Sequence, residues 1–213
     1  MKKFSQWLSE NKFWLCESVS AEEFLLQDAD VDEMYEIFKK SYEESTGHSW
    51  DLNTFLGRAS DWTFYGIKPT EKNDPKAGFV AVRKQKSGII KLTGVGGNPF
   101  SINRGLDLLI ATGKPIWGGV SEKIAEALTK KGFIIPPKSL ITQVAPYIPG
   151  FNVNALGNVV ANITGGVGEV EKTIVINNAY LDWLETEHPN LSTAIKAARA
   201  GMAIVNWFTG EKS

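Results

Sequence analysis

The stretch Ile89–Phe133, which reads IIKLTGVGGNPFSINRGLDLLIATGKPIWGGVSEKIAEALTKKGF, decides the fold. Apolar runs alternate in it with segments of helical periodicity, and this predicts a βαβα unit whose first turn is rich in glycine. Ser101 and Ser121 can cap the two helices, and Gly113 and Gly132 follow them. The predicted elements are a strand over 89–95, a helix over 101–111, a strand over 115–120, a helix ending before 132 and a strand over 133–135.

Upstream of this unit the patterns predict a strand, two helices and two further strands. The first helix follows Asp30, which can form a capping box with Glu33, and Gly47 ends it. The last two strands form an antiparallel meander with 89–95, and the helix crossing to the next strand implies one parallel pairing. The ranges are a strand at 23–27, helices at 31–46 and 51–58, and strands at 62–67 and 78–83.

Downstream of the unit the character of the sequence changes at Pro136. Prolines and a Gly/Asn-rich segment reaching 168 indicate a long loop or a set of short β pieces. A strand is predicted at 173–176, with helices at 179–186 and 191–208. The apolar seam of the last helix favours packing on its own domain over a partner surface.

Composition limits the classes of function. The 213 residues carry a formal net charge of -1, which disfavours non-specific binding to nucleic acid. No apolar run reaches the roughly 18 residues that span a bilayer. The single Cys16 and two histidines allow neither an internal disulfide nor a structural zinc site, so we expect a reducing cytoplasm and no bound metal.

The N-terminal segment 1–20 allows two interpretations. Phe4, Trp7 and Leu8 share one helical face, which indicates a short amphipathic helix. The opening MKKFSQWLSE also resembles the capsid-targeting peptides of large tailed phages, with Leu8-Ser9-Glu10 as the protease site. That resemblance implies a phage protein that associates with the capsid, made in the host cytoplasm and packaged in the virion.

The order of elements, together with the segments Phe24–Phe38 and Lys114–Phe133, resembles the GCN5-related N-acetyltransferases (GNAT). The resemblance implies an α/β (α+β) fold in which helices flank a mixed, mostly antiparallel sheet. It places the GNAT-like domain at 21–177 and a C-terminal helical extension at 178–213. It further implies acetyl-CoA as cofactor and an amine on a small molecule or protein as acceptor.

The same resemblance implies that the turn after the fourth strand binds the pyrophosphate of the cofactor, through backbone N–H groups at a helix start. The departure from the family pattern is Asp107, which stands where a small residue is expected. Gly94, Gly96 and Gly97 can instead form an anion nest, or they only permit a bulged strand end and a tight turn. The implied cofactor-binding residues are Val95, Gly96, Gly97, Ser101, Asn103, Arg104 and Gly105.

Acyl transfer to an amine needs a base and an acid near the substrate. The resemblance implies a carboxylate or an ordered water on the fourth or fifth strand and a tyrosine in the helix before Gly-Phe. This chain has Lys91 and Thr93 on the strand and Leu128-Thr129 in the helix, so neither role is visibly filled. Candidate substitutes, each with a structural alternative, are Glu122, Tyr65 and His48. Trp117 and Gly118 are candidate acceptor-binding residues, and core packing is the alternative for Trp117.

Three functions follow from these features. The first is an acyl-CoA-dependent N-acyltransferase of GNAT type. The second is a catalytically silent GNAT-like virion or interaction protein, which the missing tyrosine, Asp107 and the phage-like leader favour. The third is a GNAT-like transferase that modifies bases of phage DNA, against which the net charge argues.

Overall fold

A computed structural model describes residues 20–27, 30–144, 152–153, 159–162, 169–171 and 173–209. All but Ser20 of the predicted leader lies outside these residues, so its two interpretations remain predictions. The division into domains at 21–177 and 178–213 likewise stays a prediction. None of the helices in the described ranges is long and apolar enough to cross a bilayer.

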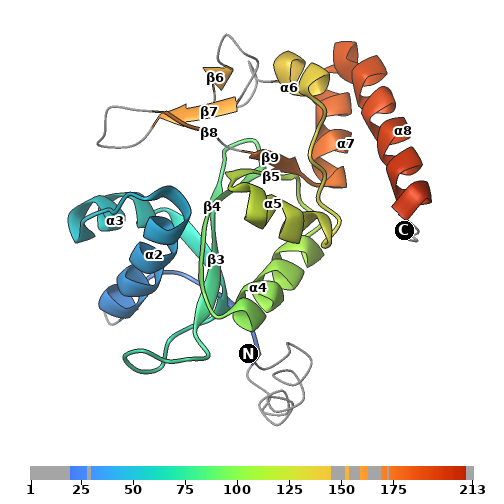
Figure 1. The fold of residues 1–213 in the computed structure, drawn as a ribbon. Coiled ribbons are helices and arrows are strands. Elements are labelled where there is room, and N and C mark those ends of the chain that lie inside the picture. The colour runs from blue at the N-terminus through green and yellow to red at the C-terminus, as the bar shows by residue number, and fades with distance from the viewer. Residues whose placement is uncertain are drawn as a thin grey trace, which may run out of the picture.

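A six-stranded mixed sheet forms the centre of the molecule (Figure 1). Neighbouring strands are antiparallel except β4 and β5, which are parallel because a helical crossover joins them. The predicted fold class, the meander and the single parallel pairing are therefore confirmed. In sheet order the strands are β1 (Glu22–Phe24), β2 (Trp62–Ile67), β3 (Gly78–Lys84), β4 (Ile90–Gly97), β5 (Ile116–Val120) and β9 (Thr173–Ile176).

Helices cover both faces of the sheet. Figure 1 shows α2 (Val31–Thr46) and α3 (Leu52–Ala59) on one side of β3 and β4, and α4 (Pro99–Ala111) and α5 (Glu122–Thr129) on the other. The first pair buries an aromatic cluster centred on Phe38, Phe55 and Phe64, and the second pair buries an aliphatic cluster with Leu109 and Leu128. Because strand side chains alternate between faces, β2 and β3 each contribute to both clusters.

The C-terminal part adds a third cluster around Trp117, Tyr180 and Ile195. Its helices are α6 (Lys138–Val144), α7 (Asn178–Glu187), the 3-10 turn η4 (Pro189–Leu191) and α8 (Ser192–Thr209). The first part of the last helix, through Ile195 and Ala198, therefore packs on its own protein, as predicted. The short strands β6 (Asn152–Val153), β7 (Val159–Asn162) and β8 (Glu169–Glu171) form a separate sheet, so the alternative of short β pieces is the one observed.

Several local predictions are wrong. The segment 133–135 forms a single bridge between Ile134 and Ile176 in place of a strand, and α6 was not predicted. Asp30 makes no capping bond to α2, because its carboxylate pairs with Lys68 Nζ at 2.8 Å. Asn98, and not Ser101, caps α4.

Candidate functional site

The strands β4 and β5 separate partway along their length. They pair only from Ile90 with Ile116 to Leu92 with Gly118. Beyond this point β4 stays on β3 and β5 stays on β9, so a wedge opens between them. Gly118 stands at the last close contact, where a Cβ atom would lie 2.8 Å from Leu92 Cβ.

A β-bulge lies at the opening of this wedge. Ala81 pairs with Gly94 and Val82 pairs with Leu92, which leaves Thr93 as an extra residue in β4. A bulge interrupts the ladder and re-aims the side chains near it. Thr93 is therefore directed by the backbone into the opening and away from regular pairing.

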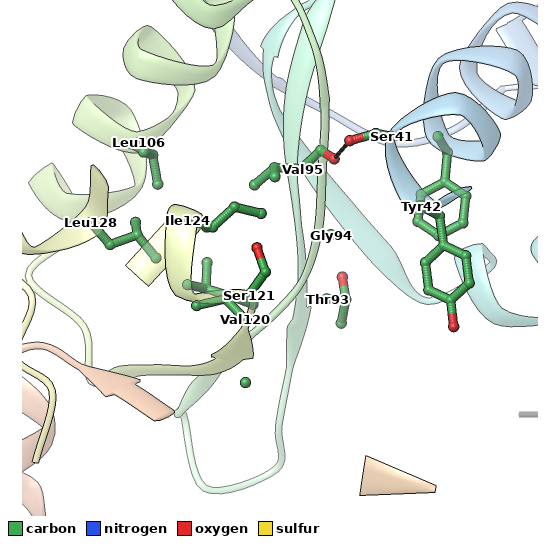
Figure 2. Close-up of a pocket in the computed structure, with 13 residues that line it drawn as sticks. Ser41, Tyr42, Thr93, Gly94, Val95, Leu106, Val120, Ser121, Ile124 and Leu128 are labelled. Carbon is green, nitrogen blue, oxygen red and sulfur yellow. Dashed lines mark hydrogen bonds between the residues drawn. The ribbon is translucent and has the colours of Figure 1, made fainter. Parts of the chain in front are cut away.

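A pocket of about 90 Å³ occupies the wedge. Figure 2 shows Ser41, Tyr42 and Thr93 on one side of the β4 ribbon and Leu106, Ile124 and Leu128 on the other. The pocket therefore passes through the plane of the sheet. Its lining comprises Phe38, Ser41, Tyr42, Leu92, Thr93, Gly94, Val95, Leu106, Gly119, Val120, Ser121, Ile124 and Leu128.

Hydroxyl groups supply the polar part of the lining. Ser41 Oγ donates to the backbone oxygen of Val95 at 2.7 Å, and this bond ties α2 to β4. Thr93 Oγ1 is buried without a hydrogen-bond partner among the described residues. Ser121 stands at the start of α5, but its side chain makes no capping bond. In the described part of the chain the lining contains no carboxylate and no imidazole.

The start of α4 is closed by the loop between β2 and β3. Asn98 Oδ1 accepts from Phe100 N at 2.8 Å, and Asn98 Nδ2 donates to the Pro75 oxygen at 2.7 Å. Ser101 is fully buried, and its hydroxyl donates to the Lys76 oxygen. Pro99 has no N–H group, so few donors of this helix start remain for an anion.

The glycines around this turn serve close backbone contacts. A Cβ on Gly97, whose φ is 88°, would lie 2.5 Å from the Ala77 oxygen. On Gly105 it would lie 2.1 Å from the Tyr65 oxygen, where α4 crosses β2, and on Gly96 it would meet Ile37 and Phe79 at 3.2 Å. At Gly96 and Gly97 these close contacts fit the alternative of a bulged strand end and a tight turn, and Gly105 allows α4 to approach β2.

The remaining predicted cofactor residues do not gather at one place. Val95 lines the pocket, whereas Asn103 and Arg104 are exposed on α4, with the Arg104 guanidinium 5.5 Å from the Phe100 ring. Asp107 pairs with Lys131 Nζ at 2.6 Å. This ion pair offsets the negative charge that set the chain apart from the family pattern.

None of the predicted catalytic residues lines the pocket. Glu122 is exposed at the first position of α5, and His48 is exposed in the loop between α2 and α3. Tyr65 is buried beside α4, where burial and a hydrogen bond to Glu23 raise its pKa to about 12. A phenol with this pKa holds its proton at neutral pH.

Trp117 and Gly118 lie just before the wedge. The Trp117 side chain is 1% exposed and packs in the cluster of the C-terminal helices. Its indole Nε1 donates to Gln85 Oε1 at 3.4 Å, and Lys91 Nζ lies 5.0 Å from its ring centre. The indole is therefore part of the core at the edge of the site.

Sequence reasoning missed Ser41, Tyr42 and Ser121 as pocket residues. Ser41 and Tyr42 occupy the last turns of α2, where the apolar stripe carries Tyr42 but gives no sign of what it faces. Ser121 was interpreted only as a cap. The sequence signal for an opening was glycine within two neighbouring strands, at Gly94 and at Gly118 and Gly119, because glycine inside a strand marks close approach or irregular pairing. Among the described residues no group of three or more His, Cys, Asp or Glu side chains can hold a metal ion.

No family model and no curated protein sequence matches the chain. Among solved structures, the chain is similar to N-acetylglutamate synthase from Neisseria gonorrhoeae, with 10% identity, a TM-score of 0.47, and coverage of 76% of this chain and 35% of that one. The chain thus spans about a third of the length of that protein.

Two further solved structures are similar over nearly their whole length. One is a GNAT-family acetyltransferase from Staphylococcus aureus Mu50, with 12% identity, a TM-score of 0.47, and coverage of 75% of this chain and 99% of that one. The other is spermidine N-acetyltransferase from Vibrio cholerae, with 11% identity, a TM-score of 0.42, and coverage of 76% and 98%. Matches at this level do not show that the chain belongs to the family.

Proposed function

We propose that this protein is an acyl-CoA-dependent N-acyltransferase that moves an acyl group to an amine of a small molecule or protein. The observation that carries the proposal is the pocket through the sheet, where β4 and β5 separate after Leu92 and Gly118. Such a passage lets a slender thioester approach from the α4 and α5 side while an amine approaches from the α2 side. The similar structures from Neisseria gonorrhoeae and Vibrio cholerae are complexes with coenzyme A.

The pocket is suited to the slender pantetheine arm of coenzyme A. The start of α4 is less suited to the pyrophosphate of the cofactor. The pocket is narrow, and its walls are apolar except for hydroxyl groups and the backbone of β4 and β5. Thr93, Gly94 and Val95 on one strand and Gly119 and Val120 on the other would hold the arm, and acetyl-CoA would supply the activated acyl group. The closed start of α4 offers few free N–H groups, so the phosphates would rely on exposed basic side chains such as Arg104.

Hydroxyl groups of the lining would take part in the chemistry. Tyr42 Oη, at the end of α2, would hold the proton that a leaving thiolate needs. Because the described lining has no carboxylate or imidazole to act as a base, the amine must arrive in its neutral form. Val120, Ile124 and Leu128 would exclude water from the acyl group, since they form the apolar wall on the α5 side.

Calorimetry with CoA and acetyl-CoA tests the proposal. Wild-type protein should bind both, and Ile124→Trp should abolish binding because the indole fills the pocket. Ile135→Trp is the matched control, since Ile135 is 46% exposed and lies outside the lining. Absence of binding to wild-type protein at millimolar ligand would overturn the proposal.

Steady-state kinetics tests the assigned roles. Tyr42→Phe should lower kcat by about a hundredfold, as loss of a general acid does, with unchanged affinity for CoA. In the wild-type protein kcat/KM should rise with pH up to the pKa of the acceptor amine itself. A plateau beginning near pH 6 to 7, about the pKa of a histidine, would show instead that the chain supplies its own base.

A binding protein without catalysis is the second candidate. The closed start of α4 and the absence of a carboxylate in the described lining favour it. Such a protein would transfer no acyl group to any amine, whether or not it binds CoA. If it associates with a capsid, the protein should be present in phage particles. Mass spectrometry of purified particles would detect the chain there and show whether it begins after Glu10.

A further inference from the structure

Four residues that pair across neighbouring strands form a row on the sheet, in which Arg83 and Lys91 stand between Trp62 and Trp117. Trp62 of β2 pairs with Arg83 of β3, Arg83 pairs with Lys91 of β4, and Lys91 pairs with Trp117 of β5. Residues that pair directly project from the same face of a sheet. The row therefore lies on the face that α2 and α3 cover in part.

The ends of this row are buried, and its middle is open. Trp62 is 5% exposed in the cluster of α2 and α3, and Trp117 is 1% exposed in the cluster of α7 and α8. The Arg83 side chain is 58% exposed, and Lys91 is half-buried with its ammonium 5.0 Å from the Trp117 ring centre. Two separate helix layers thus leave the cations accessible between them.

Paired like charges in a sheet are unfavourable unless another charge offsets them. Arg58 of α3 adds a third cation, with its guanidinium 5.0 Å from the Trp50 ring centre. Burial, and then the charges of Arg83 and Arg58, lower the pKa of Lys91 below its ordinary value. Asp61 offsets part of this charge, because its carboxylate binds Arg83 Nη2 at 2.5 Å.

The cations lie beside the pocket through the sheet. Thr93, which lines the pocket, is two residues beyond Lys91 on β4. Tyr42 also lines the pocket, and its ring centre is 4.9 Å from that of Trp50, the ring that Arg58 covers. The positive group therefore lies on the side from which the proposed acceptor would approach.

We propose that Arg83 and Lys91, with Arg58, bind an oxyanion, and that this oxyanion is a carboxylate or phosphate carried by the amine acceptor. The assignment of the anion to the acceptor rests on the proposed acyltransferase function. An oxyanion relieves the repulsion between the paired cations, and the planar guanidinium of Arg83 matches the geometry of both groups. The buried Trp62 and Trp117 end the row on either side of the two cations.

Binding of inorganic phosphate and of acetate, as two separate probes, tests the anion site without any turnover. Each salt is titrated into the full chain at constant ionic strength set with sodium chloride, and tryptophan fluorescence reports occupancy. We expect saturable binding of at least one probe and an affinity about tenfold lower in Lys91→Met, as expected when a bond to a charged group is lost. Lys86→Met, in the exposed turn between β3 and β4, is the matched control and should behave as wild type.

Arg83→Gln is a second variant for the same test, in case Lys91→Met does not fold. We expect it to fold because the Arg83 side chain is largely exposed. It should weaken the same probe. Equal affinities in wild type and in either folded variant would overturn the proposal, as would a response without saturation in the wild-type protein.

Paired amines then test whether the anion belongs to the acceptor. O-phosphoethanolamine is compared with ethanolamine, and 4-aminobutyrate with butylamine, by release of thiol from acetyl-CoA. We expect at least a tenfold preference in kcat/KM for one anionic member, and loss of that preference in Lys91→Met. Equal rates with charged and neutral amines would overturn the acceptor assignment but not acyl transfer. Lys91-dependent phosphate binding without any transfer would overturn the acyltransferase function, and the acceptor assignment with it, but not the anion site.

Discussion

Thr93 is the residue at which the regular sheet gives way to the pocket. It is the extra residue of the β4 bulge, and its Oγ1 is buried without a partner among the described residues. A buried hydroxyl without a hydrogen bond lowers stability by about 1–3 kcal/mol. The protein keeps this group in the pocket lining, where a ligand would satisfy it.

Thr93→Val should therefore separate stability from binding. Removing the hydroxyl while keeping the shape should raise Tm by about 2–4 °C per kcal/mol gained. It should weaken acetyl-CoA binding roughly three- to tenfold, the size of a neutral hydrogen bond. Calorimetry and thermal unfolding measure the two effects.

Thr112→Val is the control for that substitution. Thr112 Oγ1 donates to the Leu109 oxygen at 2.7 Å, away from the pocket, so its loss should lower Tm and leave binding unchanged. A lower Tm in Thr93→Val as well would contradict the unsatisfied hydroxyl at Thr93.

Helix α4 is the element whose placement decides how the site can be used. Its start is bound to the loop before β3 through Asn98 and Ser101, and its middle touches β2 at Gly105. These contacts draw the helix so close to the sheet that its first turn is filled by protein groups. An anion at this end must therefore bind side chains more than backbone N–H groups.

Gly105→Ala should destabilise the protein because the new methyl would lie 2.1 Å from the Tyr65 oxygen. Overpacking of this kind lowers the free energy of unfolding by about 1–3 kcal/mol. Gly57→Ala in α3 is the matched control, since nothing lies within 4 Å of its Cβ position. That change should stabilise the helix by about 0.5–1 kcal/mol, and urea unfolding of both variants measures the contrast. Similar effects of the two changes would show that α4 has room to move off β2.

At the scale of the whole molecule, the C-terminal helices cover a second part of the sheet face that α2 and α3 cover only in part. Asn177 joins α7 to β5, because its side chain accepts from Ile116 N at 2.9 Å and donates to the Lys114 oxygen at 2.8 Å. Trp117 is buried between this layer and the sheet. The two helix layers together bury the ends of the Arg83 and Lys91 row, and this arrangement places a lysine where its charge is unfavourable.

The pH dependence of stability tests that arrangement. The pKa of Lys91 lies below 10.5, chiefly through burial and then through Arg83 and Arg58. Between the lowered pKa and 10.5 the unfolded chain binds more protons than the folded one, so the Lys91 contribution to stability rises with pH there. Below the lowered pKa, Lys91 is charged in both states, and it lowers the free energy of unfolding by a constant amount.

The free energy of unfolding of wild type, minus that of Lys91→Met, should therefore increase as pH rises through the alkaline interval below 10.5. Urea unfolding at a series of pH values gives this difference. Lys86→Met, whose lysine is exposed, should give a difference that stays flat. A flat difference for Lys91→Met would mean that the folded protein does not perturb this lysine.

Most elements could be predicted from the sequence because their signals are local. The strands Trp62–Ile67 and Thr173–Ile176 lie where they were predicted, and so does α2, which ends at Gly47 with φ 71°. Predictions failed where a side chain found a distant partner. Asp30 binds Lys68 instead of capping α2, and Ser101 binds Lys76 instead of capping α4.

By itself the sequence determined a mixed sheet with flanking helices, because hydrophobic periodicity and Gly, Pro and Asn punctuation act over a few residues. Only the tertiary structure decided the site. Ser41, Thr93 and Ser121 meet in one pocket because a bulge shifts β4 and because β4 and β5 part after Gly118. Lys91 and Arg83 become neighbours through the register of β3 and β4. Both depend on contacts between segments far apart in the chain, which no local pattern of residues encodes.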